Sequence, residues 1–156
     1  MENVKPQQTP ESGPKEHYMG DYGSAKKLLG QRSAFKKAAF FLPHLCSGMN
    51  LLDCGCGPGA LTVDLAKAVA PGHVVGIDID ESQFEVGRAI VLERGIETVR
   101  FEAGDIYRLS FPDRSFDAVF AHAVLYHLKD PRKALAEMRR VLKPGGELYF
   151  ADVFAG

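Results

Sequence analysis

Short apolar runs alternate along the chain with longer segments in which apolar residues recur every three or four positions. The apolar runs predict strands near residues 49–54, 73–78, 97–102, 116–121 and 146–152. The segments between them have the spacing of amphipathic helices. This alternation predicts an α/β fold, a doubly wound parallel sheet of five strands with helices on both faces.

Turn and capping residues mark the expected helix ends. Asp80 precedes one helix and is followed by Gln83, as in a capping box, and Gly95 stops that helix. We assign Asp80 to capping rather than to ligand binding. Asp130-Pro131 predicts the start of a later helix, and Lys143-Pro144-Gly145-Gly146 predicts its end.

The N-terminal third is expected to lie outside the sheet. Residues 1–16 are rich in Pro, Gln, Glu and Ser and predict a disordered tail. Residues 17–46 form a second region, in which residues 24–45 predict one or two amphipathic helices. Tyr18 and Tyr22 belong either to a lid over a ligand or to packing against the first helix.

Composition narrows the functional classes. The chain has 156 residues, 46% hydrophobic and 25% charged, which is typical of one soluble globular domain. A net charge of -1 does not favour a nucleic-acid partner. No apolar run reaches the roughly 20 residues of a membrane span, and no signal peptide is recognisable, so a cytoplasmic location is expected.

The clearest chemical signal follows the first predicted strand. Leu51-Leu52-Asp53-Cys54 leads into Gly55, Gly57 and Gly59, an arrangement typical of a tight nucleotide-binding turn. Asp78 follows about 20 residues later, at the end of the second predicted strand, where an acid suits two ribose hydroxyls. These residues predict an adenosine-containing cofactor and leave dinucleotides and other adenosine compounds open.

Cysteine spacing gives no metal site. Cys54 and Cys56 straddle the glycine turn, and no second Cys or His pair stands at zinc-ligand spacing. We therefore predict no bound metal.

The expected topology gathers the candidate residues. Right-handed crossovers place the carboxyl ends of parallel strands along one edge of the sheet. Gly55, Asp78, Asp105 and His122 each follow a predicted strand. That edge is the predicted site.

Five sequence blocks give the chain a family resemblance. They are Leu51 to Gly59, Val75 to Asp80, Gly104-Asp105-Ile106, Phe116 to Phe120, and Leu142 to Gly146. With these blocks the chain resembles class I S-adenosylmethionine-dependent methyltransferases, in the group that includes ubiquinone and menaquinone biosynthesis enzymes. The resemblance runs from about Leu51 to Val153. It implies a Rossmann-like domain over residues 47–156 with strand order 3-2-1-4-5.

The resemblance implies roles around the cofactor. The turn containing Gly55, Cys56, Gly57 and Gly59 lies under its methionine part, and Asp78 takes the ribose hydroxyls. Asp105 accepts from the adenine amino group.

More than one role is possible for Asp53. The resemblance implies that it either holds the glycine turn or receives the ammonium group of the methionine part. From the residues alone, it can equally cap the next helix or bond to loop amides.

Four further residues are assigned to the site by the resemblance. Ile79 and Ile106 flank adenine, although isoleucines at strand ends are ordinarily core residues. Ala121 and His122 lie beside the methionine end of the cofactor.

A catalytic role is predicted for Tyr126 or His127. Either side chain could orient an acceptor or take its proton, and the alternative is structural packing. Methyl transfer is an in-line displacement at an activated carbon, so alignment and exclusion of water supply much of the acceleration. Similar enzymes that act on exocyclic amino groups or on glutamine carry an Asn/Asp-Pro-Pro-Tyr/Phe motif after the fourth strand, and this sequence has none there. The resemblance therefore implies an oxygen, carbon or sulfur atom of a small molecule as the acceptor.

The charge of the predicted site favours a methyltransferase over a nicotinamide or flavin enzyme. Asp53, Asp78 and Asp105 would rim the cleft, which suits a sulfonium cation better than a pyrophosphate. The sequence therefore favours S-adenosylmethionine as cofactor.

The chain departs from the family at its C-terminal end. The family sheet has two further strands that form an antiparallel hairpin, whereas this sequence stops at Gly156. Leu148, Phe150 and Val153 would then lie along an open edge. We expect a fragment of a longer enzyme, a sheet completed by a second copy, or a cofactor-binding module without turnover.

Overall fold

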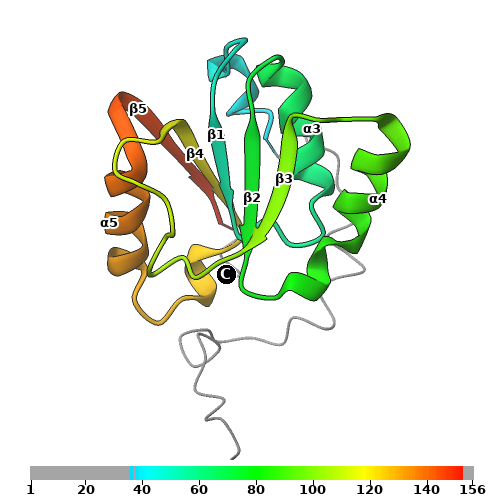
Figure 1. Ribbon diagram of the computed structural model, residues 1–156. Coiled ribbons are helices and arrows are strands. Elements are labelled where there is room, and N and C mark those ends of the chain that lie inside the picture. Colours follow the sequence, from blue (N-terminus) through cyan, green and yellow to red (C-terminus); the bar gives the residue numbers. More distant parts are fainter. Residues whose placement is uncertain (1–35, 37, 153–156) are drawn as a thin grey trace, which may run out of the picture.

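The computed structural model describes residue 36 and residues 38–152. Five parallel strands form one sheet in the order β3-β2-β1-β4-β5. They are β1 (Leu51–Cys54), β2 (Val74–Asp78), β3 (Val99–Ala103), β4 (Phe116–His122) and β5 (Leu142–Ala151). The predicted fold class and strand order are confirmed, with β1 at the centre of the sheet (Figure 1).

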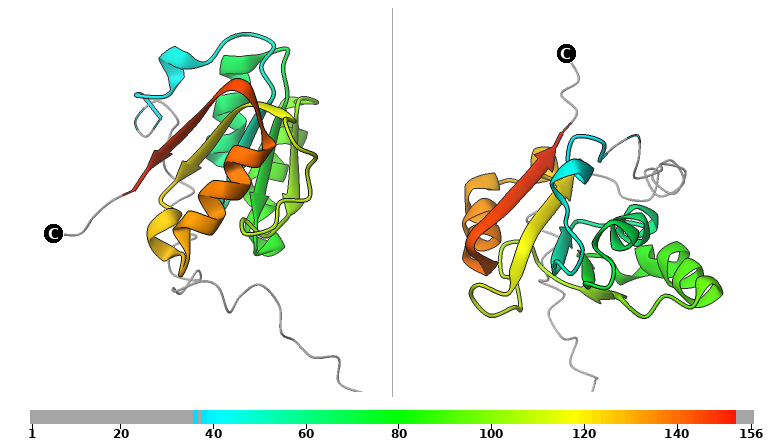
Figure 2. Two further views of the ribbon diagram at one scale, coloured as in Figure 1. Left: turned by 90° about the vertical axis from the view of Figure 1, so that its left-hand side faces the viewer. Right: turned by 90° about the horizontal axis from the view of Figure 1, so that it is seen from above.

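Helices cover both faces of this sheet. α3 (Ala60–Val69) and α4 (Glu85–Arg94) lie on one face, and α5 (Pro131–Val141) lies on the other (Figure 2). Because successive strand residues point to opposite faces, Leu51 and Leu52 enter different cores. The sheet is therefore buried on both sides, as expected for a parallel arrangement.

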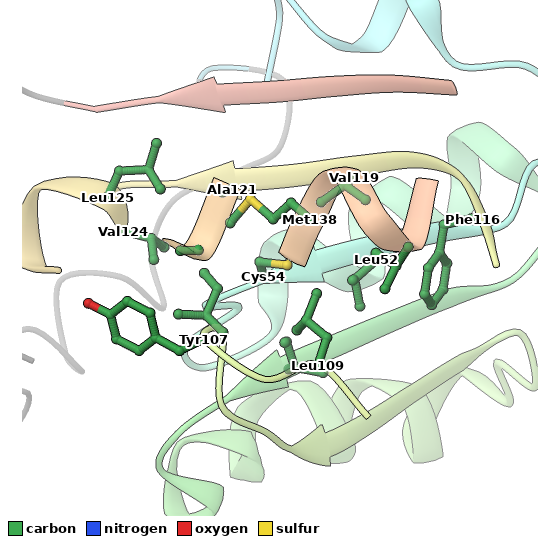
Figure 3. Packing of buried hydrophobic residues seen from close by; sticks show 14 of the residues in the cluster. Leu52, Cys54, Tyr107, Leu109, Phe116, Val119, Ala121, Val124, Leu125 and Met138 are labelled. Carbon is green, nitrogen blue, oxygen red and sulfur yellow. The ribbon is translucent and has the colours of Figure 1, made fainter. Parts of the chain in front are cut away.

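The core on the α5 side also contains the loop between β3 and β4, residues 104–115. Ile106, Tyr107 and Leu109 from this loop pack with Leu52 of β1 and Met138 of α5 (Figure 3). All five side chains are at most 5% exposed. The loop therefore contributes buried side chains to the core and does not simply run over the surface.

Only the end of the segment expected to be helical, residues 24–45, lies within the described residues. Residue 36 is helical, residues 38–41 form a bend and a turn, and a short 3-10 helix, η2 (Leu42–His44), follows. Phe41 is fully buried, and its ring stacks on Phe120 of β4 at a centroid distance of 4.8 Å. The predicted tail, Tyr18 and Tyr22 lie outside the described residues.

Two predicted helix starts are found. Asp130 caps α5 by accepting a hydrogen bond from Lys133 N at 3.1 Å. Asp80 accepts one from Ser82 N at 3.0 Å, but it caps a 3-10 helix, η3 (Glu81–Phe84), which leads into α4. Gly95 ends α4 in the left-handed conformation, as predicted.

The predicted start of β5 was wrong. β5 begins at Leu142, which pairs with Phe116, and the register then shifts so that Ala118 pairs with Glu147. Pro144-Gly145-Gly146 therefore forms an irregularity inside the strand instead of separating it from α5. A Cβ on Gly146 would lie 2.9 Å from the Asp117 carbonyl oxygen, so the close approach of the two chains requires glycine here.

β5 forms one edge of the sheet. Among the described residues it pairs with β4 alone, and Phe150 on it is 52% exposed. No helix of the described part is long and apolar enough to cross a membrane.

Candidate functional site

The carboxyl ends of the strands meet along the lower edge of the sheet in Figure 1. After β1, Gly55, Gly57 and Gly59 all have positive φ, at 70°, 53° and 82°. Gly59 immediately precedes the first residue of α3. The predicted tight turn between the first strand and its helix is therefore present.

Asp78 is bound directly to the glycine turn. Its Oδ2 accepts a hydrogen bond from Gly57 N at 2.9 Å, and its Oδ1 accepts one from Asp80 N at 3.1 Å. The side chain is 7% exposed, and burial raises the pKa of this carboxyl against the opposing effect of the two backbone donors. The structure thus holds an acid against the turn, where its oxygens can accept further hydrogen bonds.

Asp53 is more deeply buried. It is 2% exposed, and its Oδ2 accepts a hydrogen bond from the Thr62 hydroxyl at 2.7 Å. Burial raises the pKa of this carboxyl to about 7; the bond from Thr62 lowers it, and the charge of Asp78 raises it. Asp53 therefore joins β1 to the first turn of α3 through a side chain, and does not cap that helix itself.

Asp105 lies beside Asp78 at the next strand end. Gly104 N donates to the Asp78 carbonyl oxygen at 2.9 Å, which ties the two strand ends together. Oδ1 of Asp105 accepts from Tyr107 N at 2.8 Å. Two of the predicted ligand carboxyls thus follow neighbouring strands.

The two isoleucines have different environments. Ile106 is 3% exposed and belongs to the core on the α5 side, whereas Ile79 is only half-buried beyond β2. Between the two, Ile79 is the one whose surface remains open to a ligand.

Ala121 and His122 end β4. Ala121 is buried and pairs with Cys54, so it lies next to the glycine turn. His122 is half-buried, and its ring stacks near Phe120 at 6.3 Å.

Tyr126 and His127 lie further along, in the 3-10 helix η4 (Leu125–His127). Their ring centroids are 3.8 Å apart, and Tyr126 is 47% exposed. The two rings form a partly exposed aromatic pair beyond the end of β4.

Cys56 faces the sheet. A Cβ on Gly76 would lie 3.0 Å from its sulfur, and burial raises the pKa of the thiol. The side chain is therefore a neutral packing group, and a ligand would meet the backbone of this residue. Among the residues described, no cluster of His, Cys, Asp or Glu could hold a metal ion.

Gln83 has a position that the sequence did not reveal. In a capping box its side chain would bind Asp80 N, but that amide donates to Asp78 Oδ1 instead. Gln83 is 4% exposed, and its Oε1 has no hydrogen-bond partner. A buried oxygen without a partner is uncommon in a folded protein, and burying it has a cost in free energy.

Thr62 was also missed. Its role depends on the contact with Asp53 across the turn, and a threonine in an amphipathic helix carries no signal for such a contact.

The residues gathered here fit a cationic, phosphate-free adenosine compound. The set contains three carboxyls, Asp53, Asp78 and Asp105, and no lysine or arginine. Asp53 lies close enough to Asp78 for the charge of Asp78 to raise the pKa of the Asp53 carboxyl. Such a set attracts an ammonium or sulfonium group and would repel a pyrophosphate.

Comparison with known proteins identifies the family. The profile of a family described as a methyltransferase domain matches residues 45–155. The chain belongs to this methyltransferase domain family.

Individual relatives agree with this assignment. A probable methyltransferase, ltbC, of Aspergillus luteorubrus is 38% identical over 151 residues, covering 90% of this chain and 53% of the relative. A demethylmenaquinone methyltransferase of Listeria monocytogenes is 38% identical over 119 residues, covering 76% and 50%. The chain thus spans about half the length of these curated relatives.

A solved structure has the same architecture. A SAM-dependent methyltransferase from Aquifex aeolicus superposes with a TM-score of 0.75 at 29% identity. The match covers 85% of this chain and 73% of that structure.

Proposed function

We propose that this chain binds S-adenosylmethionine and transfers its methyl group to an oxygen, carbon or sulfur atom of a small molecule. The observation that carries the proposal is the hydrogen bond from Gly57 N to Asp78 Oδ2. It fixes a buried acid at the end of β2 against the glycine turn. That position suits the recognition of ribose hydroxyls.

Each predicted residue has a role in this proposal. Asp78 accepts from the ribose hydroxyls, Asp105 accepts from the adenine amino group, and Ile79 packs against the adenine ring. Ile106 supports this packing from the core.

The methionine part lies over the glycine turn. Gly55, Gly57 and Gly59 give the turn its positive φ angles, and Cys56 contributes backbone to it. Asp53 attracts the ammonium group, and Ala121 and His122 line the same end.

When bound, the cofactor supplies a methyl group already activated by a sulfonium sulfur. The protein then has to align the acceptor and exclude water, and neither task needs a fixed pair of acid and base. Tyr126 or His127 orients the acceptor or takes its proton, because both lie beyond β4, next to the proposed methionine end.

Calorimetry with S-adenosylmethionine and S-adenosylhomocysteine tests the cofactor assignment. Binding is expected for both, and Asp78→Asn should weaken it about tenfold or more by removing a charged acceptor. Glu97→Gln is the matched control, because Glu97 is exposed just before β3, at the opposite edge of the sheet. Equal losses in the two variants, or no binding by the unsubstituted chain, would contradict the proposal.

Turnover on quinol, phenol, thiol and amine acceptors tests the reaction itself. Methylation of an oxygen, carbon or sulfur acceptor supports the enzyme. Binding of both cofactor forms without turnover would instead support the second candidate, a non-catalytic cofactor-binding module.

We further propose that a second copy of the chain completes the sheet at β5. The strand pairs on one side only within the described residues, and Phe150 exposes 52% of its surface. Light scattering should detect a dimer that Phe150→Lys dissociates. Leu92→Lys, which changes an 84% exposed leucine on α4, should leave it intact. A monomer at all concentrations would contradict this pairing.

A further inference from the structure

The guanidinium of Arg140, near the end of α5, is joined to the β3–β4 loop by several hydrogen bonds. Its Nη1 donates to the Phe111 carbonyl oxygen at 2.9 Å and to Asp113 Oδ1 at 2.8 Å. Its Nη2 donates to the Leu109 carbonyl oxygen at 2.9 Å. One side chain thus satisfies two backbone carbonyls of a loop that has little regular hydrogen bonding of its own.

Glu137, one turn earlier on α5, completes this contact. It accepts from Arg140 Nε at 2.8 Å and from Nη2 at 3.0 Å, and its Oε2 also accepts from Leu109 N at 2.8 Å. Leu109 is therefore held through both its N–H and its C=O. The bidentate geometry requires the planar fork of arginine, which lysine cannot reproduce.

The same loop is held to the start of α5 at a second point. The Tyr107 hydroxyl accepts from Asp130 N at 3.1 Å, and the Tyr107 ring is 4% exposed in the core that Figure 3 shows. Tyr107 and Leu109 are thus both attached to α5.

Asp105 is hydrogen-bonded to the same anchored loop. Its Oδ1 accepts from Tyr107 N at 2.8 Å, and its carbonyl oxygen accepts from Arg108 N at 3.0 Å. The turn therefore connects the carboxyl of Asp105 to the residues that Arg140 and Glu137 hold. On its other side, Gly104 N is bound to the end of β2.

We propose that Arg140 is a positioning residue that fixes Asp105 for recognition of the adenine amino group. This role rests on the proposed cofactor. Arg140 itself touches no predicted ligand residue and acts through the backbone of Leu109 and the turn at Asp105. Its removal should therefore impair recognition of the base more than recognition of the methionine part.

The test compares two ligands by calorimetry on the full chain. S-adenosylhomocysteine carries the amino group that Asp105 would bind, and S-inosylhomocysteine replaces it with a carbonyl oxygen. The unsubstituted chain should prefer the adenosyl compound. Arg140→Gln should reduce this preference about tenfold, the effect of one charged hydrogen bond.

Arg139→Gln is the matched control. Arg139 is the neighbouring exposed arginine of α5, and its side chain makes no hydrogen bond or ion pair with the described residues. This variant removes the same charge and should keep the preference. Arg140→Lys retains the charge but lacks the planar guanidinium, so it should lose part of the preference for the adenosyl ligand. It also provides a milder variant if Arg140→Gln fails to fold.

A double variant, Arg140→Gln with Asp105→Asn, tests whether Arg140 acts through Asp105. If Arg140 acts through Asp105, then Arg140→Gln should change the ligand preference little once Asp105→Asn is present. Equal weakening of both ligands by Arg140→Gln, alongside a lower melting temperature, would overturn the positioning role and leave a purely structural one. Failure of the unsubstituted chain to bind either ligand would refute the cofactor assignment itself.

Discussion

Replacing Gly55 by alanine would separate two reasons why a glycine stands in the turn after β1. A Cβ there would lie 2.4 Å from Val124 Cγ2, and the backbone has φ of +70°. Gly95 is the matched control, because it has φ of +59° and nothing within 4 Å of its Cβ position. Gly95→Ala therefore measures backbone strain alone, expected to be about 1 to 2 kcal/mol.

Gly55→Ala adds the overlap with Val124 to a similar strain. Overpacking a filled core typically costs about 1 to 3 kcal/mol, so the total loss in the free energy of unfolding should be about 2 to 5 kcal/mol. Urea unfolding at constant pH measures both variants. Val124→Ala in the Gly55→Ala background should recover part of the loss, giving a favourable coupling of about 1 kcal/mol or more. Equal losses in Gly55→Ala and Gly95→Ala would refute the packing explanation.

Three further predictions concern buried groups. Burial raises the pKa of Asp53 to about 7, so the folded chain binds this proton more tightly than the unfolded chain. The free energy of unfolding should therefore fall as pH rises from about 4 to 7. Urea unfolding of Asp53→Asn should show a flatter pH profile, and an unchanged profile would contradict the raised pKa of Asp53. Gln83→Leu should stabilise the chain by about 1 kcal/mol in urea unfolding, since it removes a buried oxygen that has no hydrogen-bond partner. Loss of stability in this variant would contradict that explanation. Alanine ordinarily favours helices, but Gly87→Ala should destabilise α4, because the new Cβ would lie 2.5 Å from the Phe101 ring. In thermal melts, adding Phe101→Leu to this variant should relieve the effect.

The sheet could be predicted from the sequence because its information is local. Each strand is a short apolar run, and the right-handed crossover rule then restricts where successive strands lie. The start of β5 was missed for the opposite reason. Whether Leu142 continues a helix or begins a strand depends on its pairing with Phe116, which lies in a distant part of the chain.

The details of the site depend on similar distant contacts. Asp80 and Gln83 have the spacing of a capping box, but Asp78 takes the backbone amide that Gln83 would bind. The contact of Asp53 with Thr62 and the anchoring of the loop by Arg140 likewise require the folded turn and loop. Sequence spacing could locate the carboxyls, whereas their partners could be found only in three dimensions.

The glycines and the carboxyls of the site carry different kinds of information. Gly55 is required by its contact with Val124, and Gly59 by the Phe101 ring, which lies 2.4 Å from its Cβ position. Both contacts would be needed in a chain that binds no ligand, so these glycines report mainly on the fold. The carboxyl of Asp78 also has internal partners, the backbone N–H groups of Gly57 and Asp80, but they offset only part of the cost of burying its charge. Asp78 therefore gives stronger support for a cofactor than the glycine pattern does, and its substitution is the sharper test of function.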